Sequence, residues 1–374
     1  MAKIIGILNM EPSYVNVEGI EDYRPISAAS IFGRYRVADF MLSNFTNSGI
    51  KNIHVHIKNR PRSIIEHIHR TNYNINTKNG RILLLHGEKP ATNEIYNTDI
   101  ASFAANMQFV EESNPSYVVI APCHFIFKEN FQDMIDYHIE HKNDITMLYQ
   151  PVKNADEYFL GCDVLLPDEK DKNRVAGTRK NRGKFKTGNI SLETYVMAAS
   201  TFVDLVRKAQ ETSSLYSLSD IVKDAIEKDG MKVGMMKHHS FVACLNSLKA
   251  YYEASMSVRE QKELLELIND EWPIYTMTND SCPTLYKEGA SVKGSIVANG
   301  CIIEGTVINS VIGRNVVIKE GSVVKDSVIL PDALINKKVK LENCVVDRYA
   351  IITHTKELKG EKDSPLYVKR RDRI

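Results

Sequence analysis

A repeated pattern near the C-terminal end of the chain constrains its fold more strongly than any other feature. Between Ser291 and Ile352, each short unit opens with an aliphatic residue and continues with small or polar residues, as in Ile303-Glu-Gly-Thr-Val-Ile. Units of about six residues are typical of a parallel β-helix, in which one aliphatic side chain per face stacks inside the coil. Strands this short and this evenly spaced do not suit an ordinary β-sandwich. The pattern therefore predicts a β-helix, with loops or a cap at Asn309–Val311 and Asn336–Lys340.

The part of the chain before the repeat predicts a different architecture. Short apolar runs alternate there with segments whose apolar residues recur at the spacing of an amphipathic helix. Such alternation is typical of a three-layer α/β fold with a mostly parallel sheet. Ligands of such sheets lie beyond the carboxyl ends of the strands, so we expect the site at the loops after Leu8, His86 and Ile120. The predicted strands are Lys3–Leu8, Ile53–Ile57, Ile82–His86, Tyr117–Ala121, Asp144–Gln150, Tyr158–Leu166, Glu193–Ala199 and Met231–Met236, and the predicted helices are Arg62–Arg70, Thr98–Glu112, Asn130–His141, Phe202–Gln210, Leu218–Asp229 and Leu248–Leu267.

These two patterns divide the chain. Trp272-Pro273 ends the last helical stretch, because the residue before a proline disfavours the helical conformation. We therefore expect an α/β domain at residues 1–268, a linker at residues 269–289 and the β-helix at residues 290–374.

The composition excludes several classes of protein. Lys and Arg number 48 and Asp and Glu 47, so there is no overall positive charge that would attract nucleic acid. The chain has no apolar run of about 18 residues and no signal-peptide pattern at Met1–Gly6, so no membrane association is expected. The six cysteines are scattered, which fits reduced thiols in a cytoplasmic protein better than a disulfide framework or a zinc site. One segment, Lys170–Lys186, is locally basic.

Four stretches resemble one known family. Phe32–Ile50 reads FGRYRVADFMLSNFTNSGI, and the likeness continues at Ala250–Met256, Glu271–Thr276 and Asp326–Ile335. These motifs, in both domains, are similar to those of bacterial glucose-1-phosphate adenylyltransferase (ADP-glucose pyrophosphorylase). The resemblance implies a Rossmann-like, GT-A-like nucleotidyltransferase domain and a left-handed β-helix. It also implies an activity that joins ATP to glucose 1-phosphate, giving ADP-glucose for glycogen biosynthesis and pyrophosphate.

The stretch that should hold the triphosphate departs from the family pattern. The family has a glycine-rich loop with an arginine after the first strand, and glycines let backbone N–H groups turn toward phosphate. The matching stretch here, Leu8–Asn16, has no glycine and no arginine. Glu11 would repel phosphate and Pro12 lacks a backbone donor. We therefore expect no triphosphate binding of the family kind.

The residues at the positions of the family's two metal-binding aspartates also differ here. Cys123 and Cys244 stand at those positions. Losing two hard oxygen ligands to thiols should abolish Mg²⁺ binding. If the two cysteines face each other across the cleft, they could instead form a metal site or a disulfide; otherwise they are small buried residues that fill the vacated space. No metal and no cofactor are expected in this chain, and Mg²⁺ and ATP are expected in a catalytic partner.

Positive charge is kept at a second place. Arg24 and Arg36 align with basic residues near the effector-phosphate site of the family, at the junction of the two domains. They are candidates for an effector site, and the alternative interpretation is a set of structural ion pairs or a solvated face.

These departures together suggest a subunit without catalysis of its own. The chain resembles the regulatory, GlgD-type subunit, which would activate a catalytic paralogue in a heterotetramer, with a homodimer as a possible state of the isolated chain. Two alternatives stay open. The chain could still transfer nucleotides with rearranged ligands such as Asp39, Glu94 or Asp99, or it could be a sensor of sugar phosphates or nucleotides.

Overall fold

The computed structural model describes residues 3–86 and 97–374. In the α/β domain, β1 (Ile4–Asn9) lies in the middle of the main sheet and pairs in parallel with β4 (Asn52–His56) and β6 (Tyr117–Pro122). Strand β5 (Arg81–Leu85) extends the parallel part beyond β4. This parallel centre confirms the predicted architecture, since buried parallel strands read as nearly continuous apolar runs.

The other half of the sheet departs from the parallel pattern. The long strand β11 (Gly188–Ala198) runs antiparallel to both β6 and β8 (Ile145–Val152). The remaining strands of this half are β9 (Asp163–Pro167), β10 (Val175–Lys180) and β12 (Val233–Lys237). A small second sheet, absent from the sequence prediction, pairs β7 (Phe125–Phe127) with β13 (Val242–Cys244).

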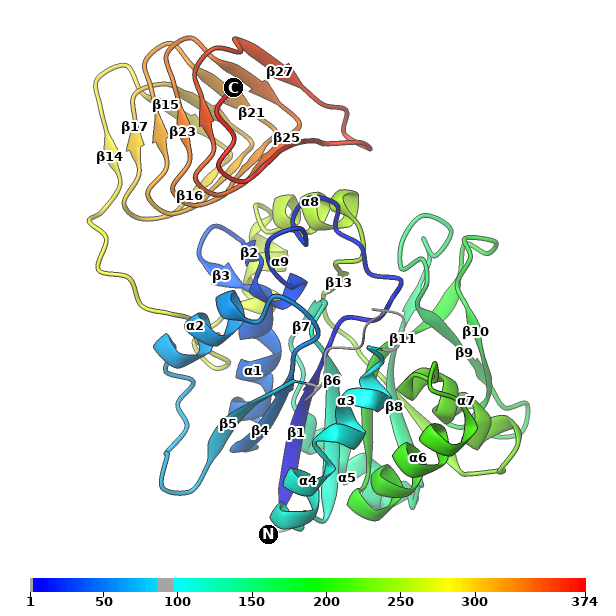
Figure 1. The fold of residues 1–374 in the computed structure, drawn as a ribbon. Coiled ribbons are helices and arrows are strands. Elements are labelled where there is room, and N and C mark those ends of the chain that lie inside the picture. Colours follow the sequence, from blue (N-terminus) through cyan, green and yellow to red (C-terminus); the bar gives the residue numbers. More distant parts are fainter. Residues whose placement is uncertain (1–2, 87–96) are drawn as a thin grey trace.

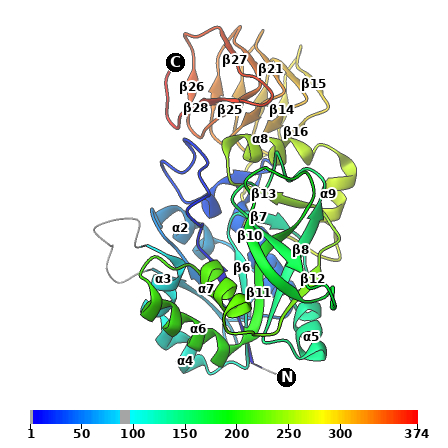
Figure 2. The same ribbon diagram turned by 90° about the vertical axis from the view of Figure 1, so that its right-hand side faces the viewer.

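Helices cover both faces of the main sheet (Figures 1 and 2). One face carries α3 (Asp99–Ala105), α4 (Met107–Ser113), α6 (Ala199–Thr212) and α7 (Leu218–Glu227), and the other carries α1 (Val37–Asn47) and α5 (Phe131–His141). The predicted single helix Thr98–Glu112 is wrong, because the chain breaks at Asn106. The side-chain amide of Asn106 donates to the backbone oxygens of Ser102 and His86. These side-chain hydrogen bonds compete with the regular helical pattern, and the helix ends there.

The β-helix consists of three parallel five-stranded sheets, β14 to β28. Val307, Val324 and Leu341 are paired positions of successive coils and are buried inside it. The stacking of aliphatic residues confirms the hexapeptide-repeat prediction. Its first strand, β14 (Leu285–Tyr286), already pairs with β17 (Ile302–Ile303), so the first coil begins within the segment expected as a linker. The strands of the three sheets are β14, β17, β20 (Val317–Ile318), β23 (Leu334–Ile335) and β26 (Ile351–Ile352); β15 (Ser291–Lys293), β18 (Thr306–Ile308), β21 (Val323–Lys325), β24 (Lys340–Glu342) and β27 (Glu357–Lys359); and β16 (Ile296–Val297), β19 (Val311–Ile312), β22 (Val328–Ile329), β25 (Cys344–Val346) and β28 (Leu366–Val368).

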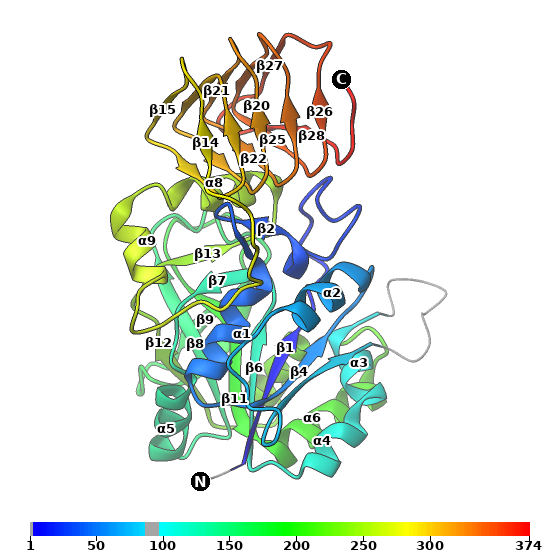
Figure 3. The same cartoon turned by 90° about the vertical axis from the view of Figure 1, so that its left-hand side faces the viewer.

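The chain between the two domains lies along α1 (Figure 3). After α8 (Leu248–Ser257) and α9 (Gln261–Leu267), the Trp272 indole N–H donates to Asn44 and the backbone N–H of Tyr275 donates to Ser43. The motif around α1 thus fixes the path toward the β-helix as well as part of the α/β core. In the described part of the chain, no helix has the length and apolarity needed to cross a bilayer.

Candidate functional site

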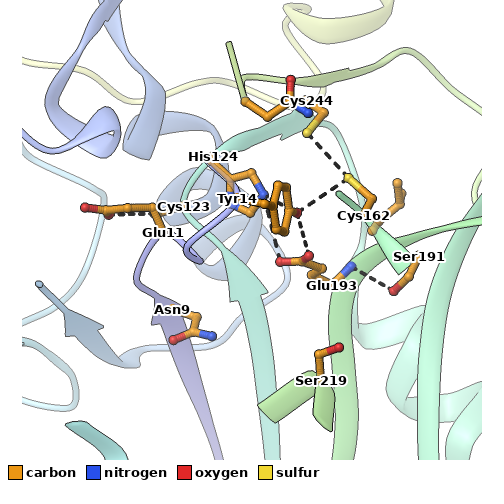
Figure 4. Close-up of polar contacts among 12 residues, drawn as sticks. Asn9, Glu11, Tyr14, Cys123, His124, Cys162, Ser191, Glu193, Ser219 and Cys244 are labelled. Carbon is orange, nitrogen blue, oxygen red and sulfur yellow. Dashed lines mark hydrogen bonds and ion pairs between the residues drawn. The ribbon is translucent and has the colours of Figure 1, made fainter. Parts of the chain in front are cut away.

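The loop that follows β1 enters the cleft at the carboxyl ends of the central strands, and Tyr14 on this loop points toward Glu193 and His124 (Figure 4). The Tyr14 hydroxyl donates to Glu193 Oε1 over 2.5 Å and lies 2.9 Å from His124 Nε2. The space beside the ring is so tight that a Cβ on Gly161 would lie 2.7 Å from a Tyr14 ring atom. In the family, the loop after the first strand binds a triphosphate. Here the side chain of Tyr14, which lies on the matching loop, occupies the cleft instead.

Glu193 reaches this position through an irregularity in β11. Its register against β8 shifts between Ser191 and Tyr195, and Glu193 has a φ of +48°, a conformation costly for a residue with a side chain. The Glu193 backbone N–H donates to Ser191 Oγ over 3.1 Å. Burial raises the pKa of Glu193 to about 7.

His124 contributes no charge to this network. Burial lowers the pKa of His124 to about 3, so the imidazole is neutral at pH 7. Its Nε2 lies 3.8 Å from Glu193 Oε2. Because the imidazole is neutral, this is a polar contact and not an ion pair. The contact that links His124 to the rest of the site is the one with Tyr14.

Cys123 and Cys244 have different neighbours. Cys123 follows β6, and its thiol donates to Glu11 Oε2 over 3.6 Å, while burial raises the pKa of both groups. Cys244 ends β13, and its Sγ lies 3.7 Å from Cys162 Sγ. The interpretation that Cys123 and Cys244 form a metal site or a disulfide with each other is not supported. Cys162, which the sequence comparison missed, is the cysteine beside Cys244.

The donor set in the cleft does not fit a magnesium ion. Mg²⁺ prefers several oxygen ligands in octahedral geometry, whereas two thiols stand at the family's carboxylate positions. Glu11 and Glu193 already accept hydrogen bonds from Cys123 and Tyr14, and the burial that raises their pKa disfavours their charged forms. Within residues 3–86 and 97–374, no group of three His, Cys, Asp or Glu side chains has the arrangement of a metal site.

The acidic residues considered as replacement ligands have other partners. Asp99 accepts from the Asn9 amide and from the backbone N–H groups of Ile100 and Leu218. Asp39 accepts from the Tyr73 hydroxyl and from the backbone N–H of Arg36, and one oxygen lies 2.6 Å from His67 Nε2. Glu94 lies outside the described residues.

One cation at the cleft was not singled out by the sequence comparison. Lys180, at the end of β10, places its Nζ 3.0 Å from Asp163 Oδ1 and 5.9 Å from the centroid of the Tyr14 ring. The antiparallel β9–β10 pair brings Lys180 opposite Asp163. Nothing in the sequence indicated that Lys180 lies near Tyr14, because this contact depends on the path of the loop that carries Tyr14.

The two effector candidates lie at the junction of the domains. Arg24 is 3% exposed, and its Nη2 lies 2.6 Å from Asp347 Oδ1 in the β-helix. Its Nε and Nη1 have no hydrogen-bond partner among the described residues. Arg36 donates to the Ala28 carbonyl and the Ser30 hydroxyl, and burial, reinforced by Arg348 and Arg24, lowers the pKa of Arg36 to about 9.

Two cavities border this junction. One of about 60 Å³ is lined by four arginines, namely Arg34, Arg36, Arg314 and Arg348. The other, of about 330 Å³, lies between the loop after β1 and the turn after β4, and Arg24 lines it together with Glu11, Glu21, Lys58 and Arg60. The junction therefore offers unpaired guanidinium donors beside space for a ligand.

The fold and the position of the cleft define a nucleotidyltransferase-type domain followed by a hexapeptide β-helix. A family model described as "Nucleotidyl transferase" matches residues 24–261, and one described as "GlmU-like, C-terminal hexapeptide" matches residues 284–364. The chain belongs to the nucleotidyl transferase family.

Its curated relatives narrow the resemblance. The chain is 27% identical over 337 residues to the glucose-1-phosphate adenylyltransferase of Bacillus cytotoxicus, covering 89% of this chain and 88% of the relative. The enzymes of the same name from Bacillus cereus and Bacillus mycoides are each 26% identical over 337 residues, covering 88% of both chains. The resemblance inferred from the motifs is thereby confirmed.

Proposed function

We propose that this chain is a non-catalytic or weakly catalytic regulatory subunit of glucose-1-phosphate adenylyltransferase. The observation that carries the proposal is the Tyr14 contact, which puts an aromatic side chain of the chain itself into the cleft. A catalytic paralogue in the same assembly would make ADP-glucose from ATP and glucose 1-phosphate for glycogen biosynthesis. Mg²⁺ and ATP would be bound by that partner.

The chemistry of nucleotidyl transfer explains why Tyr14 and its neighbours oppose catalysis. Transfer from a triphosphate needs donors and a cation that stabilise charge developing on phosphoryl oxygens. The cleft offers Glu11, Glu193 and the thiols of Cys123, Cys162 and Cys244, so these groups either repel anions or are neutral. Lys180, the cation closest to Tyr14, is already paired with Asp163.

The junction of the domains supports a regulatory role. Arg24 is buried and Arg36 is half-buried at the contact between the α/β domain and the β-helix, and Arg24 keeps two nitrogens unpaired among the described residues. An anionic effector bound there would contact both domains at once. A ligand changes an equilibrium only through different affinities for two states, and a ligand that contacts both domains would have such a difference between two arrangements of the domains.

A mixing experiment tests the proposal. Pyrophosphate release from ATP, glucose 1-phosphate and Mg²⁺ is measured for this chain alone, for a catalytic paralogue alone, and for the two purified together. We expect the isolated chain to be slower than the paralogue by roughly a hundredfold or more, because transition-state donors are missing. We expect the mixture to differ from the paralogue in rate or in its response to effectors.

Variants of the junction sharpen this experiment. Arg36→Gln should reduce the effector response of the mixture without preventing co-purification, whereas Arg62→Gln, at an exposed position on α2 (Arg62–Arg70), is the matched control. Turnover by the isolated chain at a rate comparable to the paralogue would instead favour an active enzyme with rearranged ligands. Absence of co-purification, together with unchanged kinetics, would refute the subunit role.

A further inference from the structure

Of the basic segment Lys170–Lys186 identified in the sequence, the proposed function considers only Lys180, which is paired with Asp163. Residues 172–192 contain seven Lys and Arg residues and no Asp or Glu, in a chain whose charges are otherwise balanced at 48 to 47. Isolated surface lysines need no explanation, but a run of this length without a carboxylate concentrates positive potential locally.

The fold gives this segment a fixed shape. Strands β9 and β10 pair antiparallel, and the chain then turns at Asn181 before it enters β11. The buried Asn181 amide donates to the backbone oxygens of Ala155, Tyr158 and Phe159 over 2.8 to 3.1 Å. Asn181 Oδ1 accepts from the backbone N–H of Gly183 over 3.1 Å. The turn is therefore held from the inside while its charged side chains point outward.

These side chains surround a cavity of about 190 Å³ at one end of the main sheet. The cations that line it are Arg179, Lys180, Arg182 and Lys184. Lys180 is paired with Asp163, but within residues 3–86 and 97–374 the other three cations make no ion pair. Phe185 also lines the cavity; it is 54% exposed, with the Arg179 guanidinium 4.2 Å from its ring centroid.

We propose that this cavity, the β10–β11 cavity, binds a small phosphorylated or otherwise multiply charged anion. Three unpaired cations around one small space repel one another, and an anion there converts this repulsion into attraction. Guanidinium groups match the geometry of phosphoryl oxygens, so Arg179 and Arg182 supply directional donors and Lys184 supplies a further charge. Phe185 offers an exposed ring face or edge to the organic part of such a ligand.

This site is separate from the arginines at the domain junction. β9 and β10 lie at one end of the main sheet, whereas β4 and β5 lie at the other, and Figure 1 shows the two ends on opposite sides of the domain. The residues that line the β10–β11 cavity and those that line the two junction cavities do not overlap. The inference does not depend on the proposed regulatory role.

Titration with pyrophosphate and with glycerol phosphate tests the inference. Binding to the full chain is followed by calorimetry, and by the fluorescence of a Phe185→Trp variant, which reports on the cavity itself. We expect saturable binding that weakens about a hundredfold in Arg182→Gln/Lys184→Gln, since each of the two lost charged contacts accounts for about a tenfold change. The matched control is Lys78→Gln/Lys293→Gln, which removes the same charge from exposed positions elsewhere.

Three outcomes decide the inference. Binding lost in Arg182→Gln/Lys184→Gln but kept in Arg36→Gln and in the control supports a site in the β10–β11 cavity. A signal that does not saturate, or an equal loss in the control, would mean that the segment is an ordinary solvated surface. Loss in Arg36→Gln alone would assign the anion to the domain junction and overturn the inference. Thermal unfolding of each variant establishes that the protein is folded.

Discussion

The two ends of the loop between β1 and α1 have opposite surroundings. At the cleft end, Tyr14 and Glu11 contact Glu193, His124 and Cys123, so most of the acidic and neutral groups have a partner, although His124 Nδ1 is buried without one among the described residues. At the end that reaches the β-helix, guanidinium groups outnumber their partners and several nitrogens stay unpaired among the described residues. A region that satisfies most of its polar groups gains less from a ligand than a region with several unpaired buried donors. The junction therefore has more unpaired buried donors for an anionic ligand than the cleft.

The largest effect is expected from breaking the charge contact at the junction. Arg24→Met leaves Asp347 buried without its cation and should lower the free energy of unfolding by about 3–5 kcal/mol. The double variant Arg24→Met/Asp347→Leu should lose less, because it leaves no uncompensated charge. Urea unfolding of both variants checks this. A loss below about 1 kcal/mol in the single variant would contradict the importance of this contact.

The cleft end should respond to pH through Glu193. Its pKa of about 7 in the folded protein exceeds the ordinary value of 4.5, so the folded state binds the proton more tightly. The stabilisation is complete below pH 4.5 and is lost as the pH rises through about 7, which amounts to roughly 3 kcal/mol. Unfolding measured from pH 5 to pH 8 should show this loss in the natural chain and a smaller loss in Glu193→Gln.

A second buried carboxyl, that of Glu21, serves as a control for the pH dependence assigned to Glu193. Burial also raises the pKa of Glu21 to about 7, so Glu21 contributes to the pH dependence in the same direction. Glu21→Gln should therefore remove its own part and leave that of Glu193. An identical pH profile for Glu193→Gln and the natural chain would show that Glu193 is ionised in the folded protein at all these pH values.

Removing a single hydroxyl from the cleft should have a moderate effect. Tyr14→Phe keeps the ring beside Gly161 but removes the donor to Glu193, and should cost about 1–3 kcal/mol in the free energy of unfolding. Tyr117→Phe, on β6, is a suitable control for the loss of a tyrosine hydroxyl elsewhere. Equal stability of Tyr14→Phe and the natural chain would mean that the ring alone holds this loop in the cleft.

The smallest effect concerns the thiols. Cys282 is exposed, whereas the other five cysteines are buried. Burial raises the pKa of Cys123 and Cys244, and a thiol that stays protonated reacts slowly. A thiol-reactive dye should therefore modify one cysteine quickly in the folded protein, and Cys282→Ser should abolish that phase. Rapid modification of Cys123 or Cys244, identified by peptide mass, would show that the cleft is open to small reagents.

Local patterns predicted much of the fold, and contacts between distant residues account for most of what was missed. The aliphatic repeat defined the β-helix because each unit forms the same local contact. The break at Asn106 and the antiparallel direction of β11 were missed, since both depend on packing outside the local sequence. Helix boundaries also moved, as with α6, which begins at Ala199 and not at Phe202.

The candidate site was predicted by comparison and not by pattern. The positions of Cys123 and Cys244 followed from aligned motifs, but their neighbours Glu11 and Cys162 are far away in the sequence. Tyr14 looked like one residue of an unsuitable phosphate loop, and only the path of the backbone shows that it occupies the cleft. Arg24 contacts Asp347 at the junction, a partner that could not be read from the sequence, and the effector role of Arg24 and Arg36 stays a prediction.

The contacts among Tyr14, Glu193, Cys162 and Cys244 also bear on whether single substitutions could give the cleft a metal-binding carboxylate. An aspartate at position 244 alone would place a second carboxylate in the buried neighbourhood of Glu193, and like charges in such a site destabilise each other. A small residue at position 14 alone would leave Glu193 without its donor. Each step back toward a metal-binding cleft is therefore unfavourable unless the others accompany it. A protein engineer who wanted a metal-binding cleft here would have to rebuild this cluster as one unit.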